Sequence, residues 1–209
     1  MKSPFLAAEK WACRMGFRRV AGVDEAGRGA LAGPLVAAAV ILPSREDLGL
    51  LEGLADSKVL TPVHRRKLFP RIIEVAEAWS FSCVPPWEID AHGLQEANLA
   101  AMREAVLALR PPPDLVLVDY YRVVNLGLPQ WCLVHGDSRS ASVAAASVLA
   151  KVIRDSLMLT WWTLYPEYGF DSHKGYGTPS HLRRIAERGP APCHRSSFRG
   201  VLQMKMDME

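Results

Sequence analysis

The stretch that constrains this chain most is a short apolar strand that delivers two adjacent carboxylates into a glycine-rich turn. Residues 20–23 are the apolar part, and Asp24 and Glu25 follow at once. Successive strand side chains point to opposite faces, so a regular strand aims only one of the pair into a given site. The other needs the bend that Gly27 and Gly29 permit, because glycine adopts backbone angles closed to other residues. The stretch therefore predicts an acidic strand end beside a tight loop.

Two other interpretations apply to the same stretch. The first is an acidic hairpin turn without chemistry, which is unfavourable because the two carboxylates repel each other unless a cation relieves them. The second is a dinucleotide-binding loop. The glycines at 27, 29 and 33 are spaced one residue too far apart for G-x-G-x-x-G. The acid pair would also repel a pyrophosphate, so we discard this second interpretation. The first interpretation stays open until the other motifs of the chain are considered.

The order of apolar segments predicts an α/β fold with a mixed central sheet. Residues 35–42 are almost wholly apolar and are expected to pair with the first strand as a hairpin. Residues 79–84 and 131–135 are further strand candidates. The continuous apolar run 115–118 is typical of a central strand covered on both faces. Because a hairpin comes first and strands then alternate with helices, we expect helices on both sides of the sheet.

Helices are expected between and after these strands, over residues 61–78, 94–109, 141–163 and 179–188. Thr61 followed by Pro62 is a helix start, with a capping residue before proline at the first helical position. Pro70 is expected to kink or split the first of these helices. The alanine-rich start of the helix over 141–163 would allow a close approach to the sheet.

Two further acidic residues stand at the ends of predicted elements. Asp119 follows the strand over 115–118, at the carboxyl edge where open α/β sheets place their ligands. Asp137 lies just before the helix over 141–163. A polar strand terminus is the alternative for Asp119, and plain helix capping is the alternative for Asp137.

With Asp24 and Glu25, Asp119 and Asp137 make four carboxylates at element ends in an otherwise apolar scaffold. Oxygen ligands without histidine or cysteine suit Mg²⁺ or Mn²⁺. Such a cluster serves two-metal phosphoryl transfer, in which two cations about 3.5–4 Å apart activate water and stabilise the departing oxygen. The carboxylates are therefore predicted to hold two divalent ions.

The charge distribution favours a polyanionic substrate more than the net charge of +3 does. From Gly169 to Lys205 the chain carries seven Lys or Arg against two acidic residues. A solvated helix face is one interpretation of that surplus. A basic segment beside an acidic cleft is the other, and it is what a phosphodiester-processing enzyme needs.

The bulk features predict one cytoplasmic domain, or one domain with a small appendage, in 209 residues. The 4 cysteines are scattered without a Cys-x-x-Cys pair, which argues against a zinc site and fits a reducing compartment. The first ten residues lack the apolar core of a signal peptide. The longest uncharged run, 30–44, is shorter than the roughly 20 residues of a membrane span, so no membrane association is expected.

Taken together, these motifs resemble the ribonuclease HII family over nearly the whole chain. The resemblance rests on seven groups of residues: 24–29 (Asp-Glu-Ala-Gly-Arg-Gly), 56–58 (Asp-Ser-Lys), Asp119, 136–138 (Gly-Asp-Ser), 144–147 (Ala-Ala-Ala-Ser) with Ala150-Lys151, Arg154-Asp155 and 174–176 (Lys-Gly-Tyr). It implies a ribonuclease H-like catalytic domain over 1–163. It also implies a small, basic, substrate-binding helical extension over 164–209, in a monomer.

The family further implies metal-dependent endonucleolytic cleavage of the RNA strand of RNA–DNA hybrids, and nicking 5′ of single ribonucleotides embedded in duplex DNA, as in ribonucleotide excision repair. Carried over by position, the catalytic and metal-binding residues are Asp24, Glu25, Asp119 and Asp137. The backbone of Gly27, Arg28 and Gly29, together with Tyr176, would read the ribonucleotide and the junction after it. Lys58, Lys151 and Lys174 are candidate phosphate contacts, although a mid-helix lysine such as Lys151 is equally typical of a surface ion pair.

The chain departs from the family at one place. The family usually follows its strand-end aspartate with Gly-Asn, whereas Tyr120 and Tyr121 follow Asp119 here. We expect the carboxylate to stay in place and the local backbone path to be affected.

Two competing functions come from other classes. A metal nuclease or integrase acting on DNA alone could share the carboxylates, but it would not call for the Gly-Arg-Gly and Lys-Gly-Tyr motifs. A catalytically silent nucleic-acid-binding module would have no reason to gather four carboxylates against a polyanion.

Overall fold

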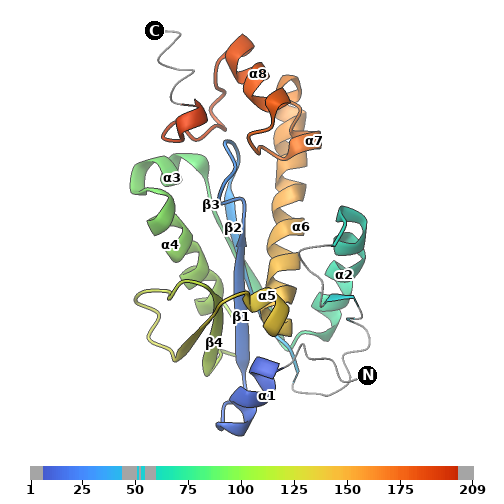
Figure 1. The fold of residues 1–209 in the computed structure, drawn as a ribbon, viewed down its shortest axis with the longest axis vertical. Helices are drawn as coiled ribbons and strands as arrows, with labels where there is room; N and C mark the ends of the chain where they lie inside the picture. The colour runs from blue at the N-terminus through green and yellow to red at the C-terminus, as the bar shows by residue number, and fades with distance from the viewer. Residues whose placement is uncertain (1–6, 44–50, 52, 55–59, 202–209) are drawn as a thin grey trace.

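The computed structural model describes residues 7–43, 51, 53–54 and 60–201. Its centre is a five-stranded sheet in the order β3-β2-β1-β4-β5 (Figure 1). The strands are β1 (Val20–Ala26), β2 (Leu35–Ile41), β3 (Ala78–Val84), β4 (Leu115–Asp119) and β5 (Gln130–Leu133). The pairs β1–β2 and β2–β3 are antiparallel, and β1–β4 and β4–β5 are parallel. The predicted mixed sheet is confirmed.

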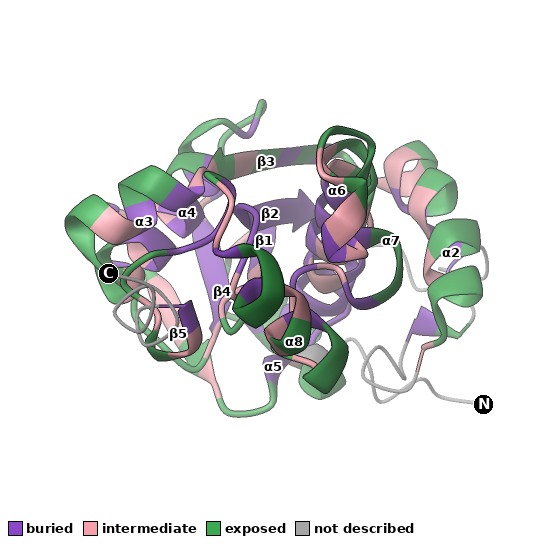
Figure 2. Ribbon diagram, turned by 90° about the horizontal axis from the view of Figure 1, so that it is seen from above, coloured by how far each residue is buried: buried purple, intermediate pink, exposed green. Residues whose placement is uncertain are grey.

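Strand β2 shows why helices cover both faces of this sheet. All seven of its residues are buried, because alternate apolar side chains point to opposite sides. Val36, Ala38 and Val40 pack in the cluster that contains α6 (Ala141–Leu164). Ala37, Ala39 and Ile41 pack with α4 (Leu94–Leu107) on the other face. Figure 2 shows the purple strands between these helices.

Helix α6 approaches the sheet closely because β1 has a glycine beneath it. A Cβ atom on Gly22 would lie 2.1 Å from the backbone nitrogen of Val143, so any other residue would push the helix away. The side chain of Ser140 accepts a hydrogen bond from the same Val143 nitrogen and caps α6. The predicted small-residue helix is confirmed within one residue at its end.

Helix α2 (Pro62–Val75) packs outside α6, and Thr61 caps it as predicted by accepting from the backbone nitrogen of His64. Pro70 does not split the helix, contrary to the expected alternative. Its buried residues Leu68 and Ile72 flank the proline and hold the helix against α6. The helix ends at Val75 rather than near residue 78, because β3 already begins at Ala78.

Several short helices have no counterpart in the sequence-based prediction. They are α1 (Ala7–Arg14), α3 (Pro86–His92), α5 (Gly136–Arg139), the 3₁₀ turn η4 (Pro166–Tyr168) and α7 (Phe170–His173). Most span one or two turns, which is too short for a period of 3.6 to be recognisable. The expected helix over 179–188 is α8 (Pro179–Arg188).

The segment 166–201, hereafter the C-terminal cap, lies over the end of the sheet where β1 and β2 are joined (Figure 1). Its Phe170, Ile185 and Val201 form a small apolar cluster together with Ala32 of the β1–β2 loop and Met158 of α6. Two isolated bridges connect it to the β1–β2 loop, Ala30 with Tyr176 and Ala32 with His194. Among the described residues, no helix is long and apolar enough to cross a membrane.

Candidate active site

A pocket of about 430 Å³ lies over the ends of β1 and β4. Asp24, Glu25 and Asp119 line it from the strands, and Gly27, Arg28 and Gly29 line it from the loop after β1. Ser147 and Lys151 of α6, Arg65 of α2 and Tyr176 of the cap complete the wall. Residues separated by more than 150 positions in the chain therefore share one hollow.

The parallel register of β1 and β4 places two of the carboxylates side by side. Val23 pairs with Val118, so Asp24 and Asp119 are the next residues on neighbouring strands. Both belong to the set of alternate positions that faces α6, whereas Glu25 lies on the α4 side of the pleat. Strand β1 continues to Ala26, so the predicted bend begins after the acid pair and not between its members. Glu25 reaches the pocket because the pocket lies over the strand ends.

Asp119 is held in place by the segment that follows the neighbouring strand. Its Oδ1 accepts a hydrogen bond of 2.9 Å from the backbone nitrogen of Gly136, the first residue of α5. The carboxylate thus has one fixed oxygen and is half-buried at the strand end. Asp119 is therefore positioned by the fold and is more than a polar strand terminus.

The carboxylates of the pocket are electrostatically unfavourable as they stand. Burial, and then repulsion from Glu25, raises the pKa of Asp24 to about 8, although a hydrogen bond from Ser147 opposes the rise. Burial also raises the pKa of Glu25, while the nearby Arg28 lowers it and Asp119 adds to the rise. Bringing a cation into the pocket would reverse these penalties.

Asp137 lies in α5, and its side chain is outside the described part of the structure. Helix α6 is capped by Ser140, so capping of that helix does not require Asp137. Among the described side chains, no three His, Cys, Asp or Glu are grouped so as to hold a metal ion. The donor chemistry itself, carboxylate oxygens without nitrogen or sulfur, fits Mg²⁺ or Mn²⁺.

Two fully buried arginines stabilise the glycine-rich loop. The hydrogen bonds that their guanidinium groups donate all go to backbone carbonyls. Arg154 of α6 donates to the carbonyls of Pro34, Ala32 and Lys174, at 2.9, 3.1 and 3.0 Å. Gly27 makes room for it with a φ of 92°, because a Cβ there would lie 1.9 Å from the Arg154 Nε. Glycine at 27 is thus required both by the turn and by the guanidinium.

Arg195 of the cap is the second of these arginines. Its Nε and Nη2 donate to the carbonyl of Gly33, and its Nη1 donates to the carbonyl of Arg28 at 3.0 Å. Burial, and then repulsion from Arg154, lowers the pKa of Arg195 to about 9, which keeps it charged at neutral pH. The two guanidinium groups fix the loop backbone that the sequence predicts to read the ribonucleotide.

Tyr176 meets the loop as predicted. Its bridge to Ala30 brings it beside Gly29, and its ring lies 5.1 Å from both the Lys151 Nζ and the Arg154 guanidinium carbon. Two cations against one ring restrict the ring's position. Tyr176 is therefore a fixed aromatic wall of the pocket.

Three buried histidines support the Tyr176 segment from inside the cap. His181 Nδ1 is 3.0 Å from the Tyr176 carbonyl and therefore carries the proton. With both rings neutral, His181 Nε2 accepts from His194 Nε2 at 3.1 Å, and His194 Nδ1 accepts from the Ala191 nitrogen at 3.0 Å. Burial lowers the pKa of His181 and of His194 to about 4. His173 likewise accepts from the Gly175 nitrogen, and burial lowers its pKa as well.

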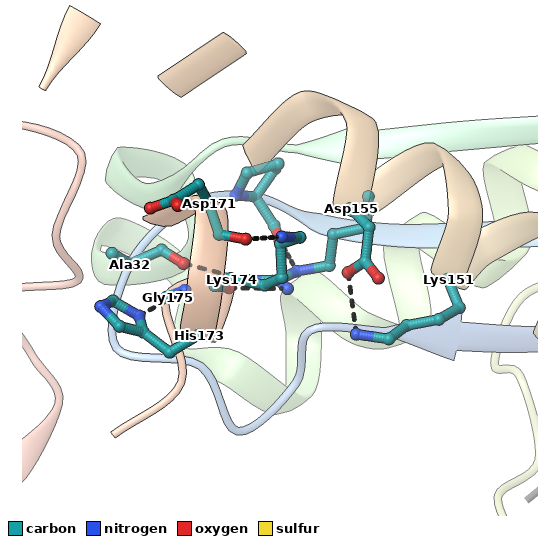
Figure 3. A network of polar contacts seen from close by, with 9 residues as sticks. Ala32, Lys151, Asp155, Asp171, His173, Lys174 and Gly175 are labelled. Carbon is teal, nitrogen blue, oxygen red and sulfur yellow. Dashed lines mark hydrogen bonds and ion pairs between the residues drawn. The ribbon is translucent and has the colours of Figure 1, made fainter. Parts of the chain in front are cut away.

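Lys174 and Lys151 face a second hollow of about 600 Å³ that adjoins the pocket through Arg65, Lys151 and Tyr176. Lys174 lines this second hollow and not the acidic pocket, and its ammonium donates to the carbonyl of Asp171 (Figure 3). Lys151 donates to Asp155 at 2.8 Å, and this ion pair is the alternative role that the sequence analysis gave for Lys151. Lys58 is outside the described residues.

Three kinds of site residue were missed by the sequence-based prediction. Ser147 faces Asp24 from α6, and the Ala-Ala-Ala-Ser run that contains it was noticed only as part of the resemblance. Arg65 lines the pocket from a helix that gave no functional signal. Arg154 was noticed only as part of the resemblance and Arg195 only as part of the basic C-terminal segment, since nothing local indicates that a charged side chain is buried.

The sheet order, with aspartates at the ends of two parallel strands in one pocket, defines a nuclease of the ribonuclease H class. A family model described as Ribonuclease HII matches residues 21–201. The chain belongs to the ribonuclease HII family. It is 55% identical over 186 residues to the ribonuclease HII of Pelotomaculum thermopropionicum, covering 89% of this chain and 70% of that protein.

Solved structures agree on the fold. The ribonuclease H2 of Pyrococcus horikoshii OT3 superposes with a TM-score of 0.78 at 29% identity, over 90% of this chain and 98% of that one. Bst-RNase HIII in complex with Mn²⁺ has the same fold at 19% identity, with a TM-score of 0.70 over 95% of this chain and 72% of that one.

Proposed function

We propose that this protein cleaves the RNA strand of RNA–DNA hybrids and nicks duplex DNA on the 5′ side of a single embedded ribonucleotide. Hydrolysis leaves a 3′-hydroxyl and a 5′-phosphate. The observation that carries the proposal is the shared pocket of Asp24, Glu25 and Asp119 with the Gly27–Gly29 loop and Tyr176. Membership of the ribonuclease HII family supports the activity on hybrids.

The proposed metal ligands are Asp24, Glu25, Asp119 and Asp137, and the proposed cofactor is two Mg²⁺ or Mn²⁺ ions. The raised pKa values of Asp24 and Glu25 support a cation requirement, because burial and mutual repulsion are what a bound cation would offset. When bound, such ions supply an activated water and charge stabilisation for the departing oxygen. The Mn²⁺ complex of a protein with the same fold supports this choice of metal.

The residues of this chain then have separable tasks. Asp119 is oriented by the backbone nitrogen of Gly136, so its second oxygen faces the pocket in a fixed direction. Ser147 orients Asp24 from α6. Lys151 and Arg65 give the wall a positive side, where the phosphates of the substrate strand are held.

Discrimination between ribose and deoxyribose is assigned to the loop and Tyr176. The 2′-hydroxyl both donates and accepts hydrogen bonds, so backbone groups can recognise it where side chains leave room. Gly29 leaves that room, since nothing lies within 4 Å of where its Cβ would be, while Gly27 accommodates Arg154. Arg154 and Arg195 keep the loop rigid. A site that hydrogen-bonds a hydroxyl rejects the analogue without it by roughly 10⁴-fold, because its polar groups are left unpaired.

The decisive experiment compares three labelled duplexes: a long hybrid, a DNA duplex with one ribonucleotide, and all-DNA, each with and without Mg²⁺ or Mn²⁺. We expect metal-dependent cleavage of the first two, a product end on the 5′ side of the lone ribonucleotide, and no cleavage of the third. Cleavage of the all-DNA duplex without cleavage of the RNA strand of the hybrid would instead favour a nuclease that acts on DNA alone, and equal rates on all three would show that ribose is not recognised.

Tyr176→Ala tests the ribose assignment within the same assay. We expect a larger loss on the lone-ribonucleotide substrate than on the long hybrid, where neighbouring contacts compensate. Tyr165→Ala is the matched control, since Tyr165 stacks on Trp161 away from the pocket. An unchanged preference between the two ribose-containing substrates would show that the ribose is read elsewhere.

A further inference from the structure

The two tyrosines that replace the family's usual Gly-Asn are both on the surface. Tyr120 is 63% exposed and Tyr121 is 39% exposed, although they follow directly after the half-buried Asp119. Their rings pack edge to face with centroids 4.8 Å apart, so each restrains the other. Two adjacent aromatic rings at this strand end contribute little to the core.

The backbone at Tyr120 keeps the conformation that glycine would adopt most easily. Its φ is 68°, in the left-handed region that a bulky aromatic residue rarely enters. The segment is held there by hydrogen bonds from the Tyr120 nitrogen to the Leu133 carbonyl and from the Tyr121 nitrogen to the Asp119 carbonyl. The expected effect on the local backbone path stays a prediction, and the structure shows that the chain carries the strain of a tyrosine in the left-handed region. Such strain is typical of sites where a side chain is needed for function.

The pair is continuous with the proposed active site through Arg28. The Arg28 guanidinium carbon lies 5.1 Å from the centre of the Tyr121 ring, and its Nη2 donates to Gln95 of α4 at 2.7 Å. Tyr176, by contrast, packs on Lys151 and Arg154 of α6. Arg28 and Tyr176 line the pocket, whereas Tyr121 lies behind Arg28. Since Arg28 contacts α4 and Tyr176 contacts α6, and these helices cover opposite faces of the sheet, the tyrosine pair and Tyr176 flank the pocket on opposite sides.

We propose that Tyr120 and Tyr121 form a second nucleotide-binding platform, against which a nucleotide flanking the cleaved phosphate packs its flat face on the side away from Tyr176. The proposal rests on the proposed function and deepens it by naming a further substrate contact. Arg28 and the exposed Arg122 place positive charge beside the rings, which suits a nucleic-acid strand and not an apolar partner. Tyrosine offers a face to either a base or a sugar.

The test uses equilibrium binding, so that it does not depend on cleavage. Fluorescence anisotropy of a labelled duplex with one ribonucleotide is measured in EDTA for the parent and for the double variant Tyr120→Gly/Tyr121→Asn. We expect the dissociation constant to rise about tenfold, within the range measured for loss of aromatic stacking on nucleotides. Phe at both positions keeps the rings and should bind within about twofold of the parent. Trp87→Leu removes an exposed ring on α3 and is the matched control.

Thermal unfolding separates this role from a structural one. Glycine at 120 relieves the left-handed strain, so the double variant should melt no lower than the parent. A lower melting temperature with unchanged binding would overturn the proposal and make the pair structural. Unchanged binding and unchanged melting would overturn it as well.

A duplex with an abasic deoxynucleotide beside the ribonucleotide identifies the face that packs. If the base packs on the rings, the parent loses its advantage over the double variant on this duplex. If the sugar packs, the advantage persists, and either result supports the platform. The proposed function fails separately, if the parent binds the labelled duplex with this advantage but cleaves no ribonucleotide-containing substrate.

Discussion

The acidic pocket and the C-terminal cap treat their buried polar groups in opposite ways. In the pocket, Asp24 and Glu25 are desolvated and repel each other, and their pKa values rise accordingly. In the cap, Arg195 and the histidines 173, 181 and 194 have hydrogen-bond partners on the nitrogens that carry protons. Of the described buried side-chain atoms without a partner, none belongs to the cap.

This difference indicates that the pocket is suited to binding a ligand and that the interior of the cap is suited to stabilising the fold. Electrostatic strain in the pocket is tolerable because a charged ligand can relieve it, at the expense of stability in its absence. The buried polar groups of the cap are instead satisfied within the chain. Mutations should therefore affect activity without stability in one region, and stability together with activity in the other.

The largest expected effect is on turnover in the pocket. Asp119→Asn should lower the single-turnover cleavage rate by about 1000-fold or more, since several kcal/mol of charge stabilisation depend on the proposed metal set. The melting temperature should stay the same or rise, because one repelling charge is removed. Glu104→Gln, on the exposed face of α4, is the control. More than a few per cent of the parent rate at saturating metal would remove Asp119 from the set.

Arg195→Met should act on stability instead. It leaves the carbonyls of Gly33 and Arg28 without their donors, and we expect the free energy of unfolding to fall by about 3 kcal/mol. Denaturant titration measures the change, and Arg199→Met at an exposed position is the matched control. A loss no larger than that of Arg199→Met would mean that the loop does not need this guanidinium.

The cap should also make the protein acid-sensitive. Because the folded-state pKa values of His181 and His194, about 4, lie below the ordinary value of 6.5, their contribution is fully present above pH 6.5. It is lost as the pH falls from 6.5 towards 4, since the unfolded chain then binds more protons. Urea titrations at a series of pH values should show a loss of a few kcal/mol over this window.

A variant identifies which group causes that pH dependence. His181→Asn keeps an amide donor near the Tyr176 carbonyl but removes one titrating ring, so its stability should vary less between pH 7 and pH 4.5. His64→Asn, exposed on α2, should follow the parent curve. Parallel curves for His181→Asn and the parent would assign the acid sensitivity to other groups.

The smallest expected effect concerns salt. Lys151→Met should reduce the slope of log binding constant against log salt concentration by roughly 0.9, the value for one phosphate contact on duplex DNA. Anisotropy titrations at several NaCl concentrations measure it. An unchanged slope would mean that Lys151 serves only Asp155 and the Tyr176 ring.

The sequence allowed the strand ends and the fold class to be predicted, because both depend on local patterns. The run 115–118 and the hairpin of residues 20–42 are apolar over their whole buried lengths, and their ends place Asp24 and Asp119 at one edge. The family resemblance added the meeting of Tyr176 with the loop, which no local pattern indicates.

The parts that could not be predicted depend on contacts between distant segments. Arg195 donates to Gly33, which is 162 positions away, and no periodicity records such a partner. The left-handed Tyr120 opposes its own local preference and is held by a strand that comes later in the chain. The alternation of a strand predicts that Glu25 lies on the opposite face of the sheet from Asp24. It does not predict that the pocket extends over the strand end, where Glu25 still lines it.

The span between Arg195 and the loop has a consequence for biosynthesis. A chain emerging from the ribosome at about 5–20 residues per second carries the Gly27–Gly29 loop long before it carries Arg195. Until then the Arg28 and Gly33 carbonyls lack the Arg195 donor, and the Tyr176 carbonyl lacks the His181 donor. The loop and Tyr176, to which we assign the recognition of ribose, are thus among the last parts of the molecule to be assembled.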